Sequence, residues 1–146
     1  MQKKIIAPNK KAFHEYLMFD KYTAGIELLG TEVKSIRLGN VNLKDSFVKI
    51  EDGEAFLYNC HIGLYDKGNR FNHEEKRTRK LLLNKKEILK IFGKVKQENY
   101  TIVPTEMFFL GHLVKLEIAL AKGKKLHDKR EAIKKRELDR DIKKLR

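Results

Sequence analysis

Basic side chains are the residues whose types and spacing could do chemistry in this chain. Residues 76–96 hold nine basic side chains and one acidic one, and residues 122–146 hold twelve basic and five acidic ones. The chain as a whole has a net charge of +13, while residues 1–75 are neutral overall. Arginines such as Arg77 and Arg79 suit phosphates because a guanidinium forms paired, charge-assisted hydrogen bonds. This clustering predicts a defined surface for a polyanion, either a nucleic acid or an anionic membrane surface.

Catalytic and metal-binding patterns are not found in the sequence. It contains no glycine-rich phosphate loop, no Gly-x-Ser-x-Gly and no His-Glu-x-x-His. The five histidines are widely spaced, so we interpret them as ordinary surface or packed residues. A single cysteine, Cys60, excludes an intramolecular disulfide and a multi-cysteine zinc site. We therefore expect no enzyme activity and no cofactor.

Apolar runs in the chain are short. The first eleven residues contain a three-residue apolar run, which is too short for a secretory signal. No apolar stretch approaches the roughly 20 residues that a membrane-spanning helix needs. We expect a soluble cytoplasmic protein that acts as a monomer and has no membrane partner.

The basic segments must be positioned by regular elements, and the sequence favours strands for most of them. Glycine in a tight turn accepts the positive φ that hairpins need, and such glycines separate several apolar or β-branched runs. We predict two hairpins and one strand region that is interrupted by Gly30. Their ranges are 47–50 with 55–58, 108–110 with 113–120, and 26–36.

Side-chain alternation gives an expectation for buried faces. Phe56, Tyr58, Cys60 and Ile62 are expected to share one face of the first hairpin and its continuation. In the second hairpin the buried set is expected to be Val114, Leu116, Ile118 and Leu120.

One helix is predicted to begin after Asn84, because Asn84 and Glu87 have the spacing of a capping box. Gly93 is expected to end this helix. The segment 9–18 fits either a short helix or a strand. Many short strands with one internal helix favour a mainly β protein built as a small closed antiparallel barrel, with an open α+β sheet as the alternative.

The last part of the chain differs from the rest. Residues 122–146 are rich in helix formers but offer a thin apolar edge of Ile133, Leu138, Ile142 and Leu145. Burial of so few side chains does not offset the ordering cost of roughly 1–2 kcal/mol per residue. We therefore divide the chain into a barrel, residues 1–121, and a basic tail, residues 122–146, that is disordered or folds as a helix against RNA or protein.

Several stretches, taken in their order and spacing, resemble the tmRNA-binding family of bacterial trans-translation, called small protein B or SsrA-binding protein. These stretches are 9–16, 24–37, 42–45, 61–62, 79–83, 101–104 and 123–130. The resemblance implies a barrel related to the oligonucleotide-binding (OB) fold, with no catalytic activity. It also implies binding to the tRNA-like domain of tmRNA (SsrA RNA) and delivery of that RNA to stalled ribosomes.

Partners follow from the same resemblance. They are tmRNA and the ribosome, at its decoding centre and empty messenger channel, and, through tmRNA, elongation factor Tu and alanyl-tRNA synthetase. A different class of function stays open beside it. The same basic surfaces would suit a structural ribosomal or ribosome-assembly protein that is bound permanently to ribosomal RNA.

The resemblance and the charge pattern together give candidate RNA-binding residues. The family motifs place RNA contacts at Glu32, Leu82, Asn84, Lys124, Lys125, Asp128, Lys129 and Arg130, and the charge pattern adds Arg77, Arg79 and Lys80. Lys34 is added as a lysine close to Glu32 in the sequence. The resemblance places His127 near the ribosomal decoding region, and we expect the tail residues Lys134, Lys135, Arg136 and Arg140 there as well.

Two of these candidates have alternative roles. Asn84 could matter only as a helix cap, which is worth roughly 1 kcal/mol. Glu32 is unusual for an RNA contact because a carboxylate repels phosphate. It could accept hydrogen bonds from base amino groups, orient Lys34, or form a plain cross-strand ion pair.

Overall fold

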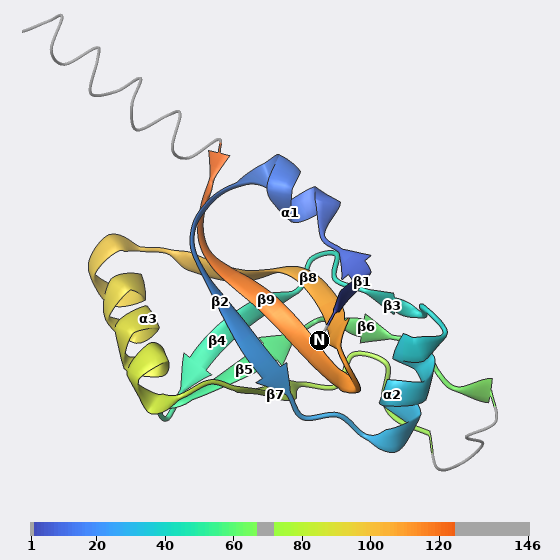
Figure 1. The fold of residues 1–146 in the computed structure, drawn as a ribbon. Coiled ribbons are helices and arrows are strands. Elements are labelled where there is room, and N and C mark those ends of the chain that lie inside the picture. The colour runs from blue at the N-terminus through green and yellow to red at the C-terminus, as the bar shows by residue number, and fades with distance from the viewer. Residues whose placement is uncertain (1, 67–71, 125–146) are drawn as a thin grey trace, which may run out of the picture.

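The computed structural model of the chain describes residues 2–66 and 72–124, which form nine strands and three helices (Figure 1). The strands are β1 (Lys3–Pro8), β2 (Tyr16–Ile26), β3 (Val41–Asn42), β4 (Phe47–Glu51), β5 (Glu54–Tyr58), β6 (His61–Ile62), β7 (Arg79–Leu82), β8 (Thr101–Leu110) and β9 (Leu113–Gly123). The helices are α1 (Lys10–Glu15), α2 (Gly30–Arg37) and α3 (Lys85–Glu98).

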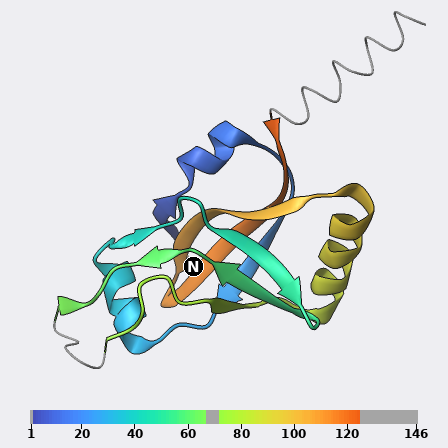
Figure 2. The same cartoon turned by 180° about the vertical axis from the view of Figure 1, so that it is seen from behind.

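Six strands form a closed antiparallel ring. Their order is β8-β4-β5-β7-β2-β9, and β9 pairs with β8 to close it. The contact between β4 and β8 is narrow, with Val48 opposite Ile102 as its one register pair. β1 pairs with the C-terminal half of β8, from Glu106 to Leu110. β3 pairs with β6 in a separate two-stranded sheet. The predicted small barrel is therefore confirmed over the open sheet, and Figures 1 and 2 show its two sides.

The barrel interior is filled by aliphatic side chains from every strand of the ring. Fully buried examples include Ala24, Leu57, Leu81, Met107 and Ile118. Helix α3 covers one end of the ring through Ile88 and Ile91, which are both buried. In β9, Leu116, Ile118 and Leu120 are buried as expected, while Val114 is partly buried.

Both predicted hairpins and the predicted helix start are confirmed. The Asn84 side chain accepts a hydrogen bond from the Glu87 backbone N–H at 2.9 Å, and Glu87 Oε1 accepts one from the Asn84 N–H. The predicted helix end at Gly93 is wrong. The helix continues to Glu98 and ends at Asn99, which adopts left-handed backbone angles. A mid-helix glycine costs only about 1 kcal/mol relative to alanine, which the packing of the helix outweighs.

The prediction of strands across residues 26–36 is also wrong. β2 ends at Ile26, and Gly30 is the first residue of helix α2, so it does not mark a strand bulge. Glu32 and Ile36, four residues apart, are both fully buried on one face of α2. Tertiary packing therefore overrides the strand preference of the β-branched residues in this segment.

The alternation of buried residues expected from Phe56 to Ile62 is broken at Asn59. Ala55 and Leu57 are buried, whereas Phe56 and Tyr58 are only partly buried. Asn59 then adopts a positive φ of 62°. This backbone reversal shifts the face, so that Cys60 and Ile62 are the buried residues that follow.

The remaining expectations concern the segment before β2, the end of β9 and the tail. The undecided segment 9–18 is a short helix, α1, followed directly by β2. β9 continues to Gly123, two residues past the domain boundary that we predict from the sequence. Residues 125–146 lie outside the described residues, so the division into barrel and tail stays a prediction. Among the described residues, no helix has the length and apolar content needed to cross a membrane.

Candidate nucleic-acid interface

The basic segment 76–96 comprises strand β7 and most of helix α3, and its lysines line the outer face of that helix. Lys85, Lys86 and Lys90 are exposed, while Ile88 and Ile91 point into the core. No described acidic side chain forms an ion pair with any of these three lysines. This α3 lysine face (Lys85, Lys86 and Lys90) therefore presents three exposed positive charges that have no ion-pair partner among the described residues.

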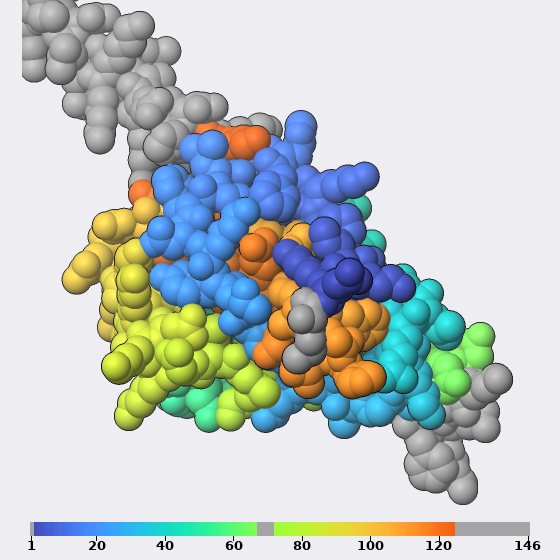
Figure 3. Space-filling view, in the orientation of Figure 1, coloured from blue at the N-terminus to red at the C-terminus, as the bar shows by residue number. Residues whose placement is uncertain are grey.

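One lysine of α3 has a different role. Lys94 forms an ion pair with Asp20 of β2, which ties the helix to the barrel wall. Figure 3 shows this region, where the yellow-green atoms of α3 lie beside the blue atoms of β2. The α3 lysine face is thus held on a fixed scaffold.

Two family-motif residues lie where β7 meets α3. Leu82 is the last residue of β7, and its side chain is 49% exposed. Asn84 is also exposed, so its amide nitrogen is available while its oxygen caps the helix. An exposed leucine beside exposed lysines can pack on a sugar or a base while the lysines contact phosphates.

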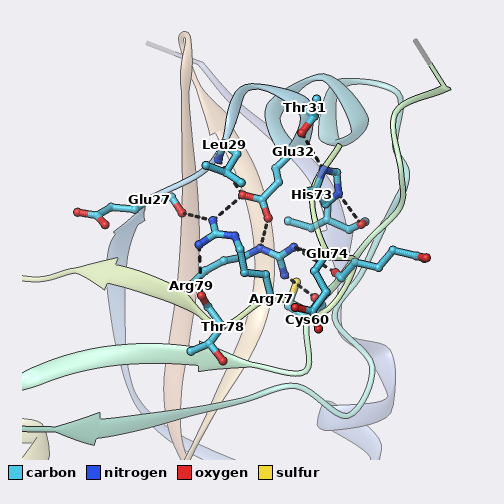
Figure 4. A network of polar contacts seen from close by, with 12 residues as sticks. Glu27, Leu29, Thr31, Glu32, Cys60, His73, Glu74, Arg77, Thr78 and Arg79 are labelled. Atoms are coloured by element: carbon cyan, nitrogen blue, oxygen red, sulfur yellow. Dashed lines mark hydrogen bonds and ion pairs between the residues drawn. The ribbon is translucent and has the colours of Figure 1, made fainter. Parts of the chain in front are cut away.

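A buried ionic network lies between α2 and β7 (Figure 4). The side chains of Glu32 and Arg79 are both fully buried, and Arg79 Nε donates to Glu32 Oε2 at 2.5 Å. Glu32 Oε1 accepts two further hydrogen bonds, one from Arg77 Nη2 at 2.6 Å and one from the Leu29 backbone N–H at 2.7 Å. Glu32 therefore joins the start of α2 to β7 and the loop before it.

The rest of the Arg79 guanidinium is also occupied. Arg79 Nη1 donates to the Cys60 carbonyl at 2.6 Å, and Nη2 donates to the Glu75 carbonyl at 3.1 Å. A direct contact of Arg79 with phosphate would require the side chain to leave this network. Glu32 is likewise fully buried. Direct RNA contact by these two residues stays a prediction, and their burial favours an indirect role.

Opposing effects act on the pKa of Glu32. Burial raises it, but the hydrogen bonds from Arg77, the Leu29 N–H and Arg79, with the charge of Arg79, outweigh burial and lower it. Glu32 is therefore an anion between two cations, with one positive charge left over. Since the Arg77 side chain is 32% exposed, that charge lies at the surface.

A buried histidine extends the network. His73 Nε2 lies 2.9 Å from the Ile62 carbonyl, which can only accept, so this nitrogen carries the proton. His73 Nδ1 then accepts from the Thr31 hydroxyl at 2.9 Å. The arrangement ties the first turn of α2 to the segment before β7, and it agrees with our interpretation of His73 as a packed histidine.

The remaining candidates lie in several places. Lys34 is exposed on α2, and its Nζ lies 5.3 Å from the centre of the Tyr65 ring. Glu32 binds Arg77 and Arg79 instead, so it does not orient Lys34. Lys80 of β7 forms a partly exposed ion pair with Glu54 at 2.9 Å. Lys124 follows the last strand and is partly buried. Lys125, His127, Asp128, Lys129, Arg130, Lys134, Lys135, Arg136 and Arg140 lie outside the described residues.

Sequence reasoning offered an ion pair as one role of Glu32 but missed its arginine partners, because it assigned a strand to the segment that contains Glu32. The signal was present in the spacing of Glu32, Ser35 and Ile36, which share one side of a helix. No side-chain cap at Leu29 announced the helix start. The pairing with Arg77 and Arg79, which lie 45 and 47 residues away, depends on tertiary structure.

Comparisons with known proteins agree on one family. The profile of the family described as "SmpB protein" matches residues 6–146. An "SsrA-binding protein" of Carboxydothermus hydrogenoformans is 58% identical over 141 residues, which cover 97% of this chain and 95% of that protein. An "SsrA-binding protein" of a Sulfurihydrogenibium species is 57% identical over 144 residues, covering 99% of this chain and 95% of that protein.

A solved structure is similar as well. It is described as "tmRNA-SmpB: a journey to the center of the bacterial ribosome". Its matching chain is 44% identical, with a TM-score of 0.68, and the match covers 80% of this chain and 82% of that one. The likeness therefore extends to the three-dimensional arrangement.

Proposed function

Because this chain belongs to the SmpB protein family, we propose that it is an RNA-binding adaptor for the tRNA-like domain of tmRNA, which it delivers to stalled ribosomes. The proposal is carried by the 57–58% sequence identity to SsrA-binding proteins over nearly the whole chain. Elongation factor Tu and alanyl-tRNA synthetase would join through the bound tmRNA. The work of the protein in this scheme is binding and positioning, with no bond made or broken.

The proposed RNA surface is the α3 lysine face together with Arg77, Leu82 and Asn84. The lysines supply phosphate contacts, which provide affinity without reading sequence. Leu82 and Asn84 supply an apolar and a polar contact beside them. Glu32 and Arg79 act indirectly, because their ion pairs fix the position of Arg77.

The tail has a separate role in this proposal. A tRNA-like domain that lacks an anticodon arm leaves the decoding centre empty. Residues 124–146 would occupy that space, with His127 near the decoding region and the basic side chains along the empty messenger channel. A basic segment of this kind gains order where ribosomal RNA supplies phosphates along its length.

Sequencing the RNA that co-purifies with the protein from cells tests the proposed partner. Enrichment of tmRNA, with fewer than one copy of the protein per ribosome, would support the adaptor role. One copy per ribosomal subunit, bound to ribosomal RNA, would instead support the alternative of a structural ribosomal protein.

Charge reversal tests the proposed surface. A variant with Lys85, Lys86 and Lys90 replaced by glutamate is expected to bind tmRNA more weakly. Its slope of log affinity against log salt should be shallower by roughly two, since each phosphate contact contributes about 0.7–0.9. The new carboxylates lie in the first turns of α3, where they suit the helix dipole, so folding should be preserved.

A matched control changes the charge equally on another face. Lys4, Lys10 and Lys44 are exposed, and they form no ion pair with any described acidic residue. Replacing these three with glutamate should reduce affinity much less. Equal losses in the two triple variants would show that net charge alone matters and would reject the α3 lysine face as the interface.

A further inference from the structure

A hollow lies at the carboxyl end of helix α2, beside the loop that follows β6. Its volume is about 680 Å³, and its lining includes Lys34, Arg37, Leu38, Leu64, Tyr65 and Asp66. The first three share one side of the helix end, because Arg37 and Leu38 come three and four residues after Lys34. The other side of α2 carries the buried Glu32 and Ile36. We call this site the α2 hollow.

Large apolar side chains are exposed at the α2 hollow. Leu38 is 74% exposed, which is the highest value among the large hydrophobic residues that the structure describes, and Leu64 is 47% exposed. Neither leucine belongs to the buried clusters of the barrel or packs against them. Apolar side chains beside a concave surface are typical of a contact site.

One side chain fixes the backbone of Tyr65. Asn72 Oδ1 accepts a hydrogen bond from the Tyr65 N–H at 3.1 Å, and Asn72 Nδ2 donates to the Tyr65 carbonyl at 2.6 Å. Tyr65 is only partly buried and stands outside the core clusters. These hydrogen bonds therefore preorganise a half-exposed aromatic residue at the α2 hollow, which lowers the entropy cost of binding a ligand there.

Two cations are available at the same place. Lys34 and Arg37 are exposed, and neither forms an ion pair with an acidic side chain in the described part of the chain. Cations in the last turn of a helix suit its dipole, but this effect does not require exposed leucines or a fixed aromatic residue beside them. Asp66 is the one acidic residue of the described lining, so the charge of that lining is positive.

This combination of side chains matches an unpaired nucleotide of RNA. A base that protrudes from an RNA stacks on aromatic side chains and packs on apolar ones, while lysine and arginine bind its phosphates. A hollow of several hundred Å³ has the size of a small-ligand site. An acidic protein segment would also meet the two cations, but a concave site with one fixed aromatic ring suits a planar base better.

The α2 hollow lies away from the α3 lysine face. Helices α2 and α3 are at opposite ends of the barrel in both views (Figures 1 and 2). The end of β9, from which the chain continues into the tail, is also remote from α2 in both views. An RNA domain bound at the α3 lysine face therefore leaves the α2 end open to a second RNA.

We propose that the α2 hollow binds an unpaired nucleotide of ribosomal RNA while tmRNA occupies the α3 lysine face. Tyr65, Leu38 and Leu64 contact the base, and Lys34 and Arg37 contact its phosphates. The barrel thereby gains a ribosomal contact that is separate from the tail. This inference rests on the proposed function, which brings the protein and tmRNA to the ribosome together.

Photo-crosslinking at two positions tests this inference and the proposed function separately. The photoreactive residue p-benzoylphenylalanine replaces Leu38 in one full chain, and in another it replaces Leu89 of α3, which is 61% exposed. Each protein is bound with tmRNA to ribosomes stalled at the end of a truncated messenger and is then irradiated. The Leu38 position is expected to crosslink to ribosomal RNA, and the Leu89 position to tmRNA.

The two crosslinks fail independently. Absence of the tmRNA crosslink at the Leu89 position would count against the proposed function. A Leu38 position that crosslinks to tmRNA, to a ribosomal protein or to no partner would overturn the α2 hollow as a ribosomal RNA site, whatever the Leu89 position shows.

Binding measurements give a second readout with a matched control. The double variant Arg37→Gln with Leu38→Ser is expected to bind ribosomes about tenfold more weakly than the parent, and to bind isolated tmRNA within about twofold of it. The control Lys4→Gln with Leu113→Ser changes an exposed lysine and an exposed leucine elsewhere, and should leave both affinities within about twofold. Thermal unfolding checks that both variants fold. Equal ribosome affinities of the variant and the control would overturn the inference.

Discussion

Arg79 offers the sharpest test of what holds the candidate interface together. Replacing Arg79 with methionine removes its hydrogen bonds to Glu32, the Cys60 carbonyl and the Glu75 carbonyl, and it keeps an unbranched side chain in the same space. Glu32 remains fully buried and retains Arg77 and the Leu29 N–H as partners. The variant thus breaks a buried ion pair from one side.

The expected cost is large compared with the stability of a small domain. Removing one partner of a buried ion pair typically costs about 3–5 kcal/mol, and total stabilities lie near 5–15 kcal/mol. For a chain of this length the melting temperature should fall by about 10 °C. Replacing Glu32 with leucine should cost a similar amount, because Arg79 is then buried without its partner.

Urea unfolding of the full chain, followed by circular dichroism, measures these losses. Lys80→Met is the matched control, since Lys80 neighbours Arg79 on β7 but forms a partly exposed pair with Glu54. That variant should lose no more than about 1 kcal/mol. The double variant Glu32→Leu with Arg79→Met should lose less than the two single losses together, with a coupling of about 1–3 kcal/mol.

The pH dependence gives a second readout of the same network. The pKa of Glu32 is lower in the folded protein than its ordinary value of 4.5, so its contribution to stability is present above that value. The contribution is lost as the pH falls through the lowered pKa. The stability difference between the parent and Glu32→Gln should therefore be constant near neutral pH and shrink below about pH 4.5. An Arg79→Met loss no larger than that of Lys80→Met would refute this reasoning.

Three further predictions address single features. Asn84→Ala should cost about 1 kcal/mol of stability whereas Asn84→Asp, which keeps the cap, should cost little; if the amide also contacts RNA, a titration should find both weaker binders of tmRNA. In thermal unfolding, Gly93→Ala should stabilise α3 by about 0.5–1 kcal/mol because its Cβ would meet open space. Deleting residues 131–146 should leave tmRNA affinity within about tenfold, or 1.4 kcal/mol, but abolish tagging of stalled chains in a reconstituted reaction; equal losses of both would contradict separate roles for barrel and tail.

The parts of the fold that sequence predicted are those governed by local rules. The turn glycines and flanking apolar runs predicted both hairpins, and Asn84 with Glu87 predicted the start of α3. The end of α3 escaped prediction because Gly93 only weakens a helix, while Val95 still packs against the core. The shifted face after Tyr58 depends on the positive φ of Asn59, a residue type that tolerates this conformation but does not require it.

The candidate site was predictable in its charge but not in its architecture. The basic count of residues 76–96 located the exposed α3 lysine face, because lysines on a helix that covers a core must point outward. The same count could not predict that Arg77 is exposed and Arg79 buried, although the two are only two residues apart. Their exposure differs because the Arg79 side chain enters the interior and binds Glu32 there, while Arg77 binds Glu32 from the rim.

This difference changes how the family motif is interpreted. A carboxylate in a basic, RNA-binding region is difficult to explain as a contact, since phosphates repel it. As a buried anchor, Glu32 is required for the opposite reason: it compensates Arg79, which β7 needs to hold the Cys60 and Glu75 carbonyls. It also fixes Arg77 at the surface with a net positive charge. Loss of RNA affinity in a Glu32 variant would then reflect a displaced Arg77. Glu32→Gln keeps a carbonyl oxygen that can accept from both Arg77 and the Leu29 N–H, so it should retain more affinity than Glu32→Ala.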